Sequence, residues 1–365
     1  MVQRPSRVAA PAHKKSSKSL PARAFATLLR SVQKDVEARL LGYLDSTVED
    51  AARHGGEVVD MVTALRDLCG RGGKRLRPAL VAVGARAARG GVSLDLALDA
   101  GVALELLQAY FLIHDDWMDE DRERRGGPTV HVQLGRVFRS ETKGAAAAIL
   151  AGDYAVALAT EVLSHLELPA RRTSQVFACF AEMQRSAVAG QQLDIIARTR
   201  DVERTYRLKT ASYTVKGPLT LGALLHGGSP RLLAALERFS EPAGVAFQLR
   251  DDLIGVFGDP ARTGKPRGGD LKAGKHTQLV ANGLDRARGK DLTTLRDVLG
   301  NRRASERQVE RAIAVLEATG AREAVESRIN ELTTAACAAL ESKALGDEGR
   351  LLLHGAVEAL TLRQV

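Results

Sequence analysis

Acidic side chains crowd one short stretch of this chain, and two arginines follow directly. The stretch reads YFLIHDDWMDEDRERRGGPT. Asp115, Asp116 and Asp119 would share one patch of a helix, because residues three and four apart are neighbours on a helical surface. Carboxylates this close repel one another unless a cation lies among them, whereas Arg124 and Arg125 would suit an anion. The pattern predicts a site for a metal-bound polyphosphate.

The metal expected at this cluster is Mg²⁺, a hard cation that binds oxygen ligands. It uses one or two carboxylates together with the phosphates of a substrate. A solvated acidic helix end is the alternative interpretation. It fits less well, because the residues before Asp115 (ALELLQAYFLIH) are too apolar for a surface helix.

A second acidic pair lies far along the chain, in FQLRDDLIGVFGDPARTGKPRGGDLKAGKHT. Gln248, Asp251 and Asp252 close another apolar helix, and a glycine-rich loop with Lys265 and Lys275 follows. Two such patches facing each other across a helix bundle would hold several metal ions. Those ions would bind a diphosphate and stabilise it as a leaving group.

A basic segment, GRGGKRLRP, is the third candidate element. Lys74, Arg75 and Arg77 follow flexible glycines, which suits direct hydrogen bonds to an anion. A basic loop that only aids solubility is the alternative. A second phosphate-bearing substrate would favour the binding interpretation.

The elements that must position these residues are helices. QVERAIAVLEATG has apolar residues at three- and four-residue spacing, and GVALELLQAYFLIHDDWMDE is apolar almost all round. Strand-like alternation is absent. We therefore expect an all-α, single-domain bundle over residues 23–365, with long central helices ringed by amphipathic ones.

The charge of the chain is concentrated at its start. The 365 residues carry a net charge of +9, but residues 1–30 hold seven Lys/Arg and no acid, so the remainder has 46 basic and 44 acidic residues. Residues 1–22, rich in Pro, Ser and Ala, are expected to form a disordered tail. The near-neutral remainder argues against a nucleic-acid partner.

Two further features bear on location. No run of about 18 apolar residues is found, so no membrane span is expected. Cys69, Cys179 and Cys337 are odd in number and lack metal-ligand spacing, which indicates reduced cysteines in a cytoplasmic protein.

Taken together, these motifs resemble those of trans-isoprenyl diphosphate synthases of the polyprenyl synthetase family, over about Gly72 to Thr277. The matching segments are GGKRLRP, DDWMD with RRGGPT, AGD, GQQLD, KTASY, and DDLIG after FQLR. The short-chain farnesyl and geranylgeranyl diphosphate synthases are the most similar members. The resemblance implies an isoprenoid synthase-type fold with a deep apolar cavity.

The resemblance also implies roles for residues at the matching positions. Metal binding, with three Mg²⁺ ions when substrate is bound, would fall to Asp115, Asp119 and Asp251, supported by Asp116 and Asp252. The allylic diphosphate would be held by Arg124, Lys209 and Lys265, under a loop carrying Lys275. Isopentenyl diphosphate would be held by Lys74, Arg77, Gln108 and Arg125, and the reacting carbons would lie beside Thr210, Gln248 and Asp194.

The chain departs from the family at one position: the second motif usually ends in a third aspartate, and here Gly255 stands there. Gly255 shares a helical stripe with Asp251, four residues before it. Since Asp251 and Asp252 remain, we expect weakened metal binding rather than its loss.

Product length should depend on the depth of the apolar channel below the metals. Phe111 lies one helical turn, about 5.4 Å, before Asp115, and Tyr110 adjoins it. These rings predict a short channel and a farnesyl product, with geranylgeranyl as the alternative. Ordinary core filling is the competing interpretation for both, and His114 is expected to be structural rather than a base.

Two rival functions share some of these features. A terpene cyclase would have acidic metal motifs but no use for an acceptor pocket at Lys74, Arg77 and Gln108. A non-catalytic subunit of a heteromeric synthase should have lost its aspartates. The expected partners are therefore isopentenyl and allylic diphosphates, and the resemblance alone implies a homodimer.

Overall fold

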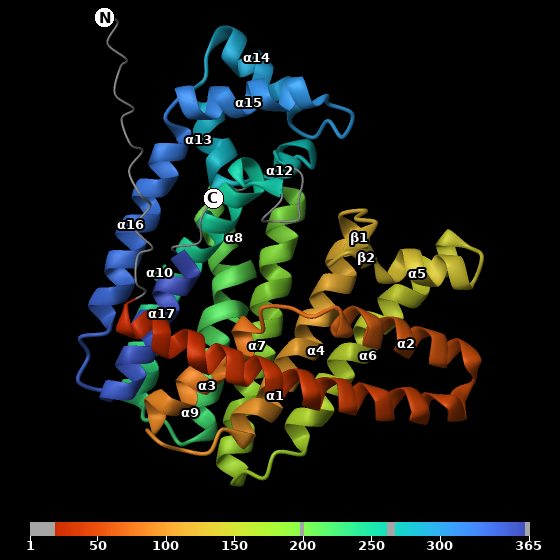
Figure 1. Cartoon of the computed structure of the whole chain (residues 1–365), viewed down its shortest axis with the longest axis vertical. Coiled ribbons are helices and arrows are strands. Elements are labelled where there is room, and N and C mark those ends of the chain that lie inside the picture. The colour runs from red at the N-terminus through yellow and green to blue at the C-terminus, as the bar shows by residue number, and fades with distance from the viewer. Residues whose placement is uncertain (1–18, 198–200, 261–266, 362–365) are drawn as a thin grey trace, which may run out of the picture.

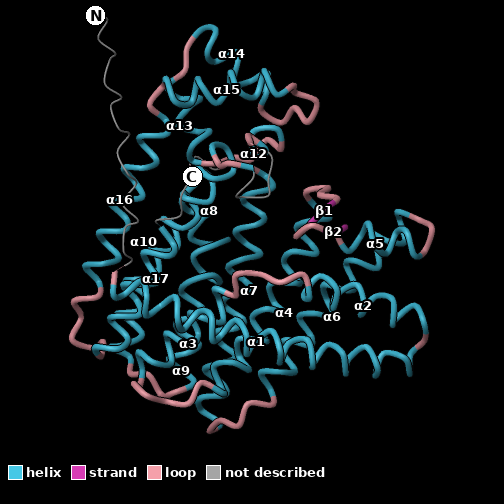
Figure 2. Tube along the Cα trace, in the orientation of Figure 1, coloured by secondary structure: helices cyan, strands magenta, loops and turns pink. Residues whose placement is uncertain are grey.

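The structure, a computed structural model, describes residues 19–197, 201–260 and 267–361. Helices make up nearly all of the regular structure in these ranges (Figures 1 and 2). The strands found there are one short antiparallel pair, β1 (Glu123–Arg124) and β2 (Gly127–Pro128). The all-α prediction is confirmed.

Two groups of helices build the molecule. The first comprises α1 (Leu20–Ala51), α2 (Gly56–Gly70), α3 (Leu76–Ala88), α4 (Asp95–Met118), α5 (Val130–Val137), α6 (Glu141–Ser164), α7 (Ala170–Ile196) and α9 (Gly217–Leu225), with the short 3₁₀-helix η1 (Ala52–His54). The second comprises α8 (Val202–Tyr206), α12 (Gly269–Lys272), α13 (Gln278–Arg286), α14 (Gly289–Val298), α15 (Glu306–Ala318) and α16 (Ala321–Ala339). The long helix α10 (Pro230–Phe257) runs through both, and α17 (Asp347–Thr361) packs on α1.

The core of the first group surrounds α4. This helix is buried on almost every side up to Ala109, because its residues are apolar all round. Its neighbours α3 and α6 supply further alanine and leucine side chains to the same core. A second core joins the last half of α10 to α12–α16. The polar ends of α4 and α10 are therefore carried by rigidly packed helices.

A π-helix, η2 (Arg207–Lys216), carries the KTASY segment and lies between α7 and α10. Two glycines permit this close packing. A Cβ atom at Gly190 of α7 would lie 2.3 Å from the backbone nitrogen of Lys209, and one at Gly244 of α10 would lie 2.4 Å from the Cβ of Ala211. The wide turns of η2 thus aim Lys209 and Thr210 from between two long helices.

The first helix begins earlier than predicted. Residues 1–18 of the expected tail lie outside the described residues, but α1 starts at Leu20 rather than after residue 22. Ser19 caps the helix by accepting a hydrogen bond from the backbone nitrogen of Ala22, and its hydroxyl donates to Glu358 of α17. The serine cap and the proline in the first turn favour a helix start at this position, although the sequence there lacks apolar periodicity.

Two helices are long and apolar enough to cross a membrane by length and composition alone, namely α4 and α6. In the most apolar windows, 72% of the residues of α4 and 39% of those of α6 are buried inside the protein. Core helices of soluble proteins meet the same criterion, so the finding gives only weak support to a span.

Candidate active site

The end of α4 carries the first acidic patch. Asp115 and Asp116 lie in its last turn, and Asp119 is its C-terminal cap. Asp116 is 1% exposed, and its carboxylate accepts hydrogen bonds from Arg124 on β1, including one of 2.7 Å from Nε. Figure 1 shows the β1–β2 hairpin beside this end of α4. The β1–β2 hairpin thus places Arg124 against the carboxylate of Asp116.

The carboxyl groups of the first patch have raised pKa values, so their charged forms are destabilised in the absence of a cation. Burial raises the pKa of Asp115 to about 6, and the neighbouring carboxylates of Asp119 and Asp116 add to the rise, while Lys209 opposes it. Burial also raises the pKa of Asp116 and of Asp119. An added cation would favour the charged form of all three.

The end of α10 carries the second patch. Asp252 is 3% exposed, and it accepts hydrogen bonds from the Tyr206 hydroxyl and, at 2.9 Å, from Gln248 Nε2. Thr210 Oγ1 donates in turn to Gln248 Oε1 at 2.7 Å. Burial raises the pKa of Asp252 to about 7, and the carboxylates of Asp270 and Asp251 contribute. A connected polar chain thus runs from η2 to α10.

Two lysines interact with the first patch. The Lys209 ammonium is 2.5 Å from Asp194 Oδ2 on α7, and although burial lowers its pKa, Asp194, Asp115 and Asp119 more than offset this. Lys275 lies 3.2 Å from Asp270 Oδ1, and its pKa is raised by Asp270 and by Asp119 despite burial. Both cations are therefore within electrostatic reach of the first patch.

A cavity of about 460 Å³ adjoins the second patch. Lys74, Arg77 and Arg125 line it together with Thr210, Gln248 and Asp251. Arg77 donates to Thr214 Oγ1 at 2.9 Å, and its guanidinium lies 4.4 Å from the ring centre of Tyr213. Its Nε is buried with no hydrogen-bond partner, and burial lowers the pKa of Arg125. Both observations favour an anion in this cavity.

The family model for polyprenyl synthetases matches residues 59–316. The chain belongs to the polyprenyl synthetase family. A short-chain isoprenyl diphosphate synthase of Methanothermobacter thermautotrophicus is 35% identical over 272 residues, spanning 72% of this chain and 78% of the relative. The farnesyl diphosphate synthase of Escherichia coli is 38% identical over 251 residues, spanning 65% and 79%.

A solved polyprenyl synthetase structure is similar over nearly its whole length. The geranylgeranyl pyrophosphate synthase of Corynebacterium glutamicum, in complex with isoprenyl diphosphate and magnesium, superposes with a TM-score of 0.86 and 37% identity. The superposition covers 92% of this chain and 99% of that one. Over the superposed part, the fold of this chain is thus that of the geranylgeranyl pyrophosphate synthase.

Not every residue of the basic segment faces the cavity in the same way. Arg75 is 3% exposed and forms ion pairs with Glu105 and Glu37, while its Nη2 donates to the carbonyl of Cys69 at 2.8 Å. Arg75 therefore anchors the segment, and its guanidinium is engaged by these protein partners. Lys74 and Arg77 remain as the anion-binding candidates of this segment.

The aromatic residues before the first motif form one cluster with η2. The ring centre of Phe111 lies 4.9 Å from that of Tyr110 and 4.9 Å from that of Tyr213. Tyr213 also donates a hydrogen bond of 3.1 Å to Gln108 Oε1. Phe111 therefore contacts Tyr213, which lines the cavity of Lys74, Arg77 and Arg125, and Tyr110 packs behind Phe111.

The remaining predicted residues are placed as follows. His114 contacts Tyr110, and its Nε2 lies 3.1 Å from the carbonyl oxygen of Ile149 on α6, which fits the structural role expected for it. Lys265 lies outside the described residues. Tyr206 donates a hydrogen bond to Asp252, and Asp270 pairs with Lys275, although no sequence motif singled out either residue. A tyrosine in a short helix and an aspartate in a glycine-rich loop give no local signal of this kind.

The side chains present fit a hard divalent cation. Among the described residues, no three carboxylate, imidazole or thiol groups are gathered closely enough to hold a metal ion alone. Magnesium commonly binds through one or two carboxylates and completes its shell with water and substrate phosphates. Asp115, Asp119 and Asp251 would hold it, because they supply oxygen ligands beside a cavity with cationic walls.

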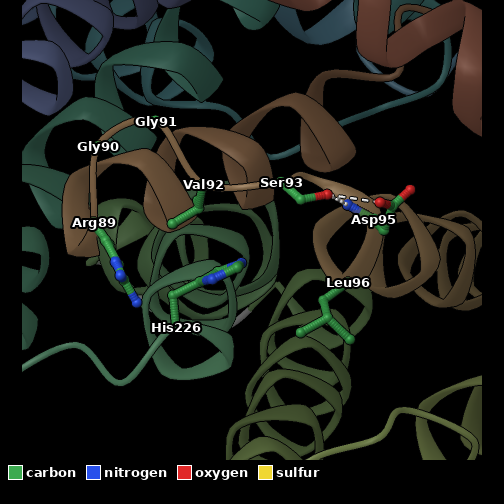
Figure 3. A pocket seen from close by; sticks show the side chains of 8 residues that line it. All are labelled: Arg89, Gly90, Gly91, Val92, Ser93, Asp95, Leu96 and His226. Atoms are coloured by element: carbon green, nitrogen blue, oxygen red, sulfur yellow. Dashed lines mark hydrogen bonds between the residues drawn. The ribbon is translucent and has the colours of Figure 1, made fainter.

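A separate cavity of about 500 Å³ lies where the chain passes from α3 to α4 (Figure 3). Arg89, Ser93 and Asp95 line it together with His226, which follows α9. No predicted site residue borders it. The cavity lies at the start of α4, whereas the β1–β2 hairpin follows the end of that helix.

Proposed function

We propose that this chain condenses isopentenyl diphosphate with an allylic diphosphate, dimethylallyl or geranyl diphosphate, and releases pyrophosphate. Its family membership makes it a trans-prenyltransferase of the short-chain isoprenyl diphosphate synthase class. The observation that carries the proposal is the pairing of acidic patches with a cationic cavity. Lys209 and Lys275 interact with carboxylates of the first patch, and Asp251 of the second patch lines a cavity together with Lys74, Arg77 and Arg125.

The donor diphosphate would bind between the two patches. Mg²⁺ held there by Asp115, Asp119 and Asp251, three ions in our proposal, would supply positive charge that stabilises pyrophosphate as a leaving group. Lys209 and Lys275 add fixed positive charge, and Arg124 reaches the same patch from β1. These cations are already held by carboxylates, so they need little reorganisation as negative charge develops on the leaving group.

The acceptor diphosphate would bind in the neighbouring cavity. Arg77 and Arg125 are held by Thr214 and by the carbonyl of Gly72, while the Nε of Arg77 has no protein partner. The isopentenyl double bond would then lie near Thr210, at the boundary of cavity and patch. This placement brings the two reacting carbons together, which supplies much of the rate enhancement.

The allylic cation would be stabilised by oriented oxygen atoms. The Thr210 hydroxyl donates a hydrogen bond to Gln248 Oε1, and Gln248 Nε2 donates one to Asp252 Oδ1. The lone pairs of the Thr210 oxygen are thereby left to face the cation, whereas a water molecule in the same place would trap it. The proton lost at the end of the reaction would be taken by the released pyrophosphate.

For the product we propose farnesyl diphosphate, with geranylgeranyl diphosphate as the alternative. The ring cluster of Tyr110, Phe111 and Tyr213 supports a short channel, because it lies within about one helical turn of Asp115. The relatives are named for both products, so sequence similarity favours neither.

We also propose that the chain acts as a cytoplasmic homodimer. Large apolar side chains stand exposed on α6 and α7, including Leu150 (59% exposed), Val188 (50%) and Ile195 (50%). A second copy covering these helices would remove that surface from water. Sedimentation equilibrium of the full chain tests the assembly directly.

The function is tested by incubating the protein with Mg²⁺, dimethylallyl diphosphate and isopentenyl diphosphate, and sizing the dephosphorylated products. We expect a linear C15 alcohol as the main product and none in the presence of EDTA. A C20 alcohol would establish the alternative product. Cyclic hydrocarbons formed from geranyl or farnesyl diphosphate supplied without isopentenyl diphosphate would indicate a terpene cyclase, and complete inactivity would favour a non-catalytic subunit.

A further inference from the structure

A side chain from a distant part of the sequence holds the end of α4. Arg302 lies in the turn between α14 and α15, 183 residues after Asp119. Its Nη2 donates a hydrogen bond of 2.5 Å to the backbone carbonyl of Asp119, and its Nη1 donates one of 3.3 Å to the Glu120 carboxylate. One guanidinium thus contacts two consecutive residues at the point where the first acidic patch ends.

These two residues lie where a helix needs an outside partner. Asp119 is the C-terminal cap of α4, and the last carbonyl groups of a helix lack partners within it. Glu120 follows with φ of +56°, a left-handed conformation that is unfavourable for residues other than glycine. A cation at this end also interacts favourably with the helix dipole. Arg302 therefore supplies a donor to the Asp119 carbonyl and pairs with the strained residue next to it.

The turn that carries Arg302 is firmly anchored in the second group of helices. Gly300 donates its backbone N–H to the carbonyl of Leu271 on α12 at 2.9 Å. Ala304 is 3% exposed in the second core, and its backbone N–H donates to the carbonyl of Asn301 at 3.0 Å. Arg302 therefore reaches the first patch from a fixed base.

We propose that Arg302 is a positioning residue for the metal site: it clamps the end of α4 to the α14–α15 turn and so fixes the backbone from which Asp119 reaches the metal. The inference rests on the proposed function, which makes Asp119 a metal ligand. The last turn of a helix tends to fray, and a ligand on a fraying turn lacks the fixed geometry that metal affinity requires. Arg302 acts through the Asp119 backbone.

Positioning and simple charge predict opposite results for a bare metal ion. The Arg302 guanidinium is positive, so if it acted only through its charge, its removal would let Mn²⁺ bind more tightly to the carboxylates. If Arg302 positions Asp119, its removal weakens the binding of the same ion. Binding of Mn²⁺ without any phosphate, measured by electron paramagnetic resonance, therefore separates the two roles.

Arg302→Gln is the principal variant. We expect the Kd for Mn²⁺ to rise about 10-fold, the lower end of the range for residues that orient metal ligands. The Mg²⁺ concentration for half-maximal binding of inorganic pyrophosphate, measured by calorimetry, should rise by the same factor. In the metal-free protein, the backbone amides of residues 119–121 should exchange faster with deuterium. The melting temperature should change little, because the Arg302 side chain is 57% exposed, and kcat at saturating Mg²⁺ should stay near the wild-type value.

Three further variants serve as controls. Arg303→Gln is the matched control and should change none of these quantities, because Arg303 is exposed and its side chain has no hydrogen bond or ion pair with the described residues. Glu120→Gln removes the carboxylate but leaves the bond to the Asp119 carbonyl, so it should keep most of the metal affinity. Arg302→Lys keeps the charge and one donor group, and it should recover part of the affinity that Arg302→Gln loses.

The proposal is overturned if Arg302→Gln binds Mn²⁺ as tightly as the wild type or more tightly, or if Arg303→Gln weakens binding equally. A lower melting temperature with unchanged Mn²⁺ binding would make Arg302 merely structural and would also overturn it. These binding measurements need no prenyl transfer. A wild type whose Mn²⁺ binding depends on Arg302 but which elongates no allylic substrate would refute the proposed function and leave this inference standing. Normal elongation with unchanged metal binding in Arg302→Gln would refute this inference alone.

Discussion

Replacing Phe111 by alanine distinguishes a channel floor from ordinary core packing. The ring lies one helical turn before Asp115 and touches Tyr110 and Tyr213, each with centroids 4.9 Å apart. If it closes the channel, its removal lengthens the space available to the growing chain. We expect the main product to gain at least one five-carbon unit.

The stability cost of the same change follows from its contacts. Truncating a fully buried phenylalanine costs about 3–5 kcal/mol, but Phe111 is only half-buried. Its two ring contacts contribute about 0.5–1.5 kcal/mol each. We therefore expect a decrease of about 2 kcal/mol in the free energy of unfolding, measured by urea denaturation.

The two measurements together decide the question. Phe138→Ala is the matched control, because Phe138 is also half-buried but caps α5, away from the ring cluster. It should cost a similar free energy and leave product length unchanged. Phe111→Ala that loses stability but stops at the wild-type product length would refute the channel-floor reasoning.

Three further perturbations test other parts of the account. Asp115→Ala should lower kcat by about 10²-fold or more, since the loss is of leaving-group stabilisation; near-normal turnover with Mg²⁺ would contradict the assignment. Without metal or substrate, the free energy of unfolding should fall as pH rises from about 4 to 8. The cause is Asp252, whose pKa is about 7 in the folded protein and about 3.9 in the unfolded chain, so that the folded state binds the proton more tightly. In urea denaturation, Asp252→Asn should reduce this pH dependence, and an unchanged dependence in the variant would exclude Asp252 as its source. Deleting residues 1–18 should leave turnover and melting temperature unchanged, whereas Ser19→Ala should cost about 1 kcal/mol through the lost cap; equal effects of the two changes would contradict the assigned cap.

The helices that carry the two acidic patches could be predicted because their signals are local. An apolar run ended by carboxylates describes both α4 and α10 without reference to any other part of the chain. The cap at Ser19 is equally local and could have been found, since a serine followed by a proline at the second helical position is a common helix start.

Other parts of the site depend on contacts that no local pattern contains. Lys74, Arg75 and Arg77 are adjacent basic residues, but only tertiary packing assigns Arg75 to Glu105. The π-helix packs between two helices that each carry a glycine where they meet it. Its own sequence does not distinguish it from an α-helix. The packing of Asp270 against Gly255 likewise depends on tertiary structure, because the two residues lie on different helices.

The most direct test of the account is a crystal structure of the protein with Mn²⁺, an unreactive thio-analogue of dimethylallyl diphosphate and isopentenyl diphosphate. The account predicts anomalous scattering from metal ions that join the allylic diphosphate to Asp115, Asp119 and Asp251, with isopentenyl diphosphate held by Lys74, Arg77 and Arg125. Metal ions absent from the two acidic patches, or a diphosphate bound instead in the cavity of Arg89 and His226, would contradict it.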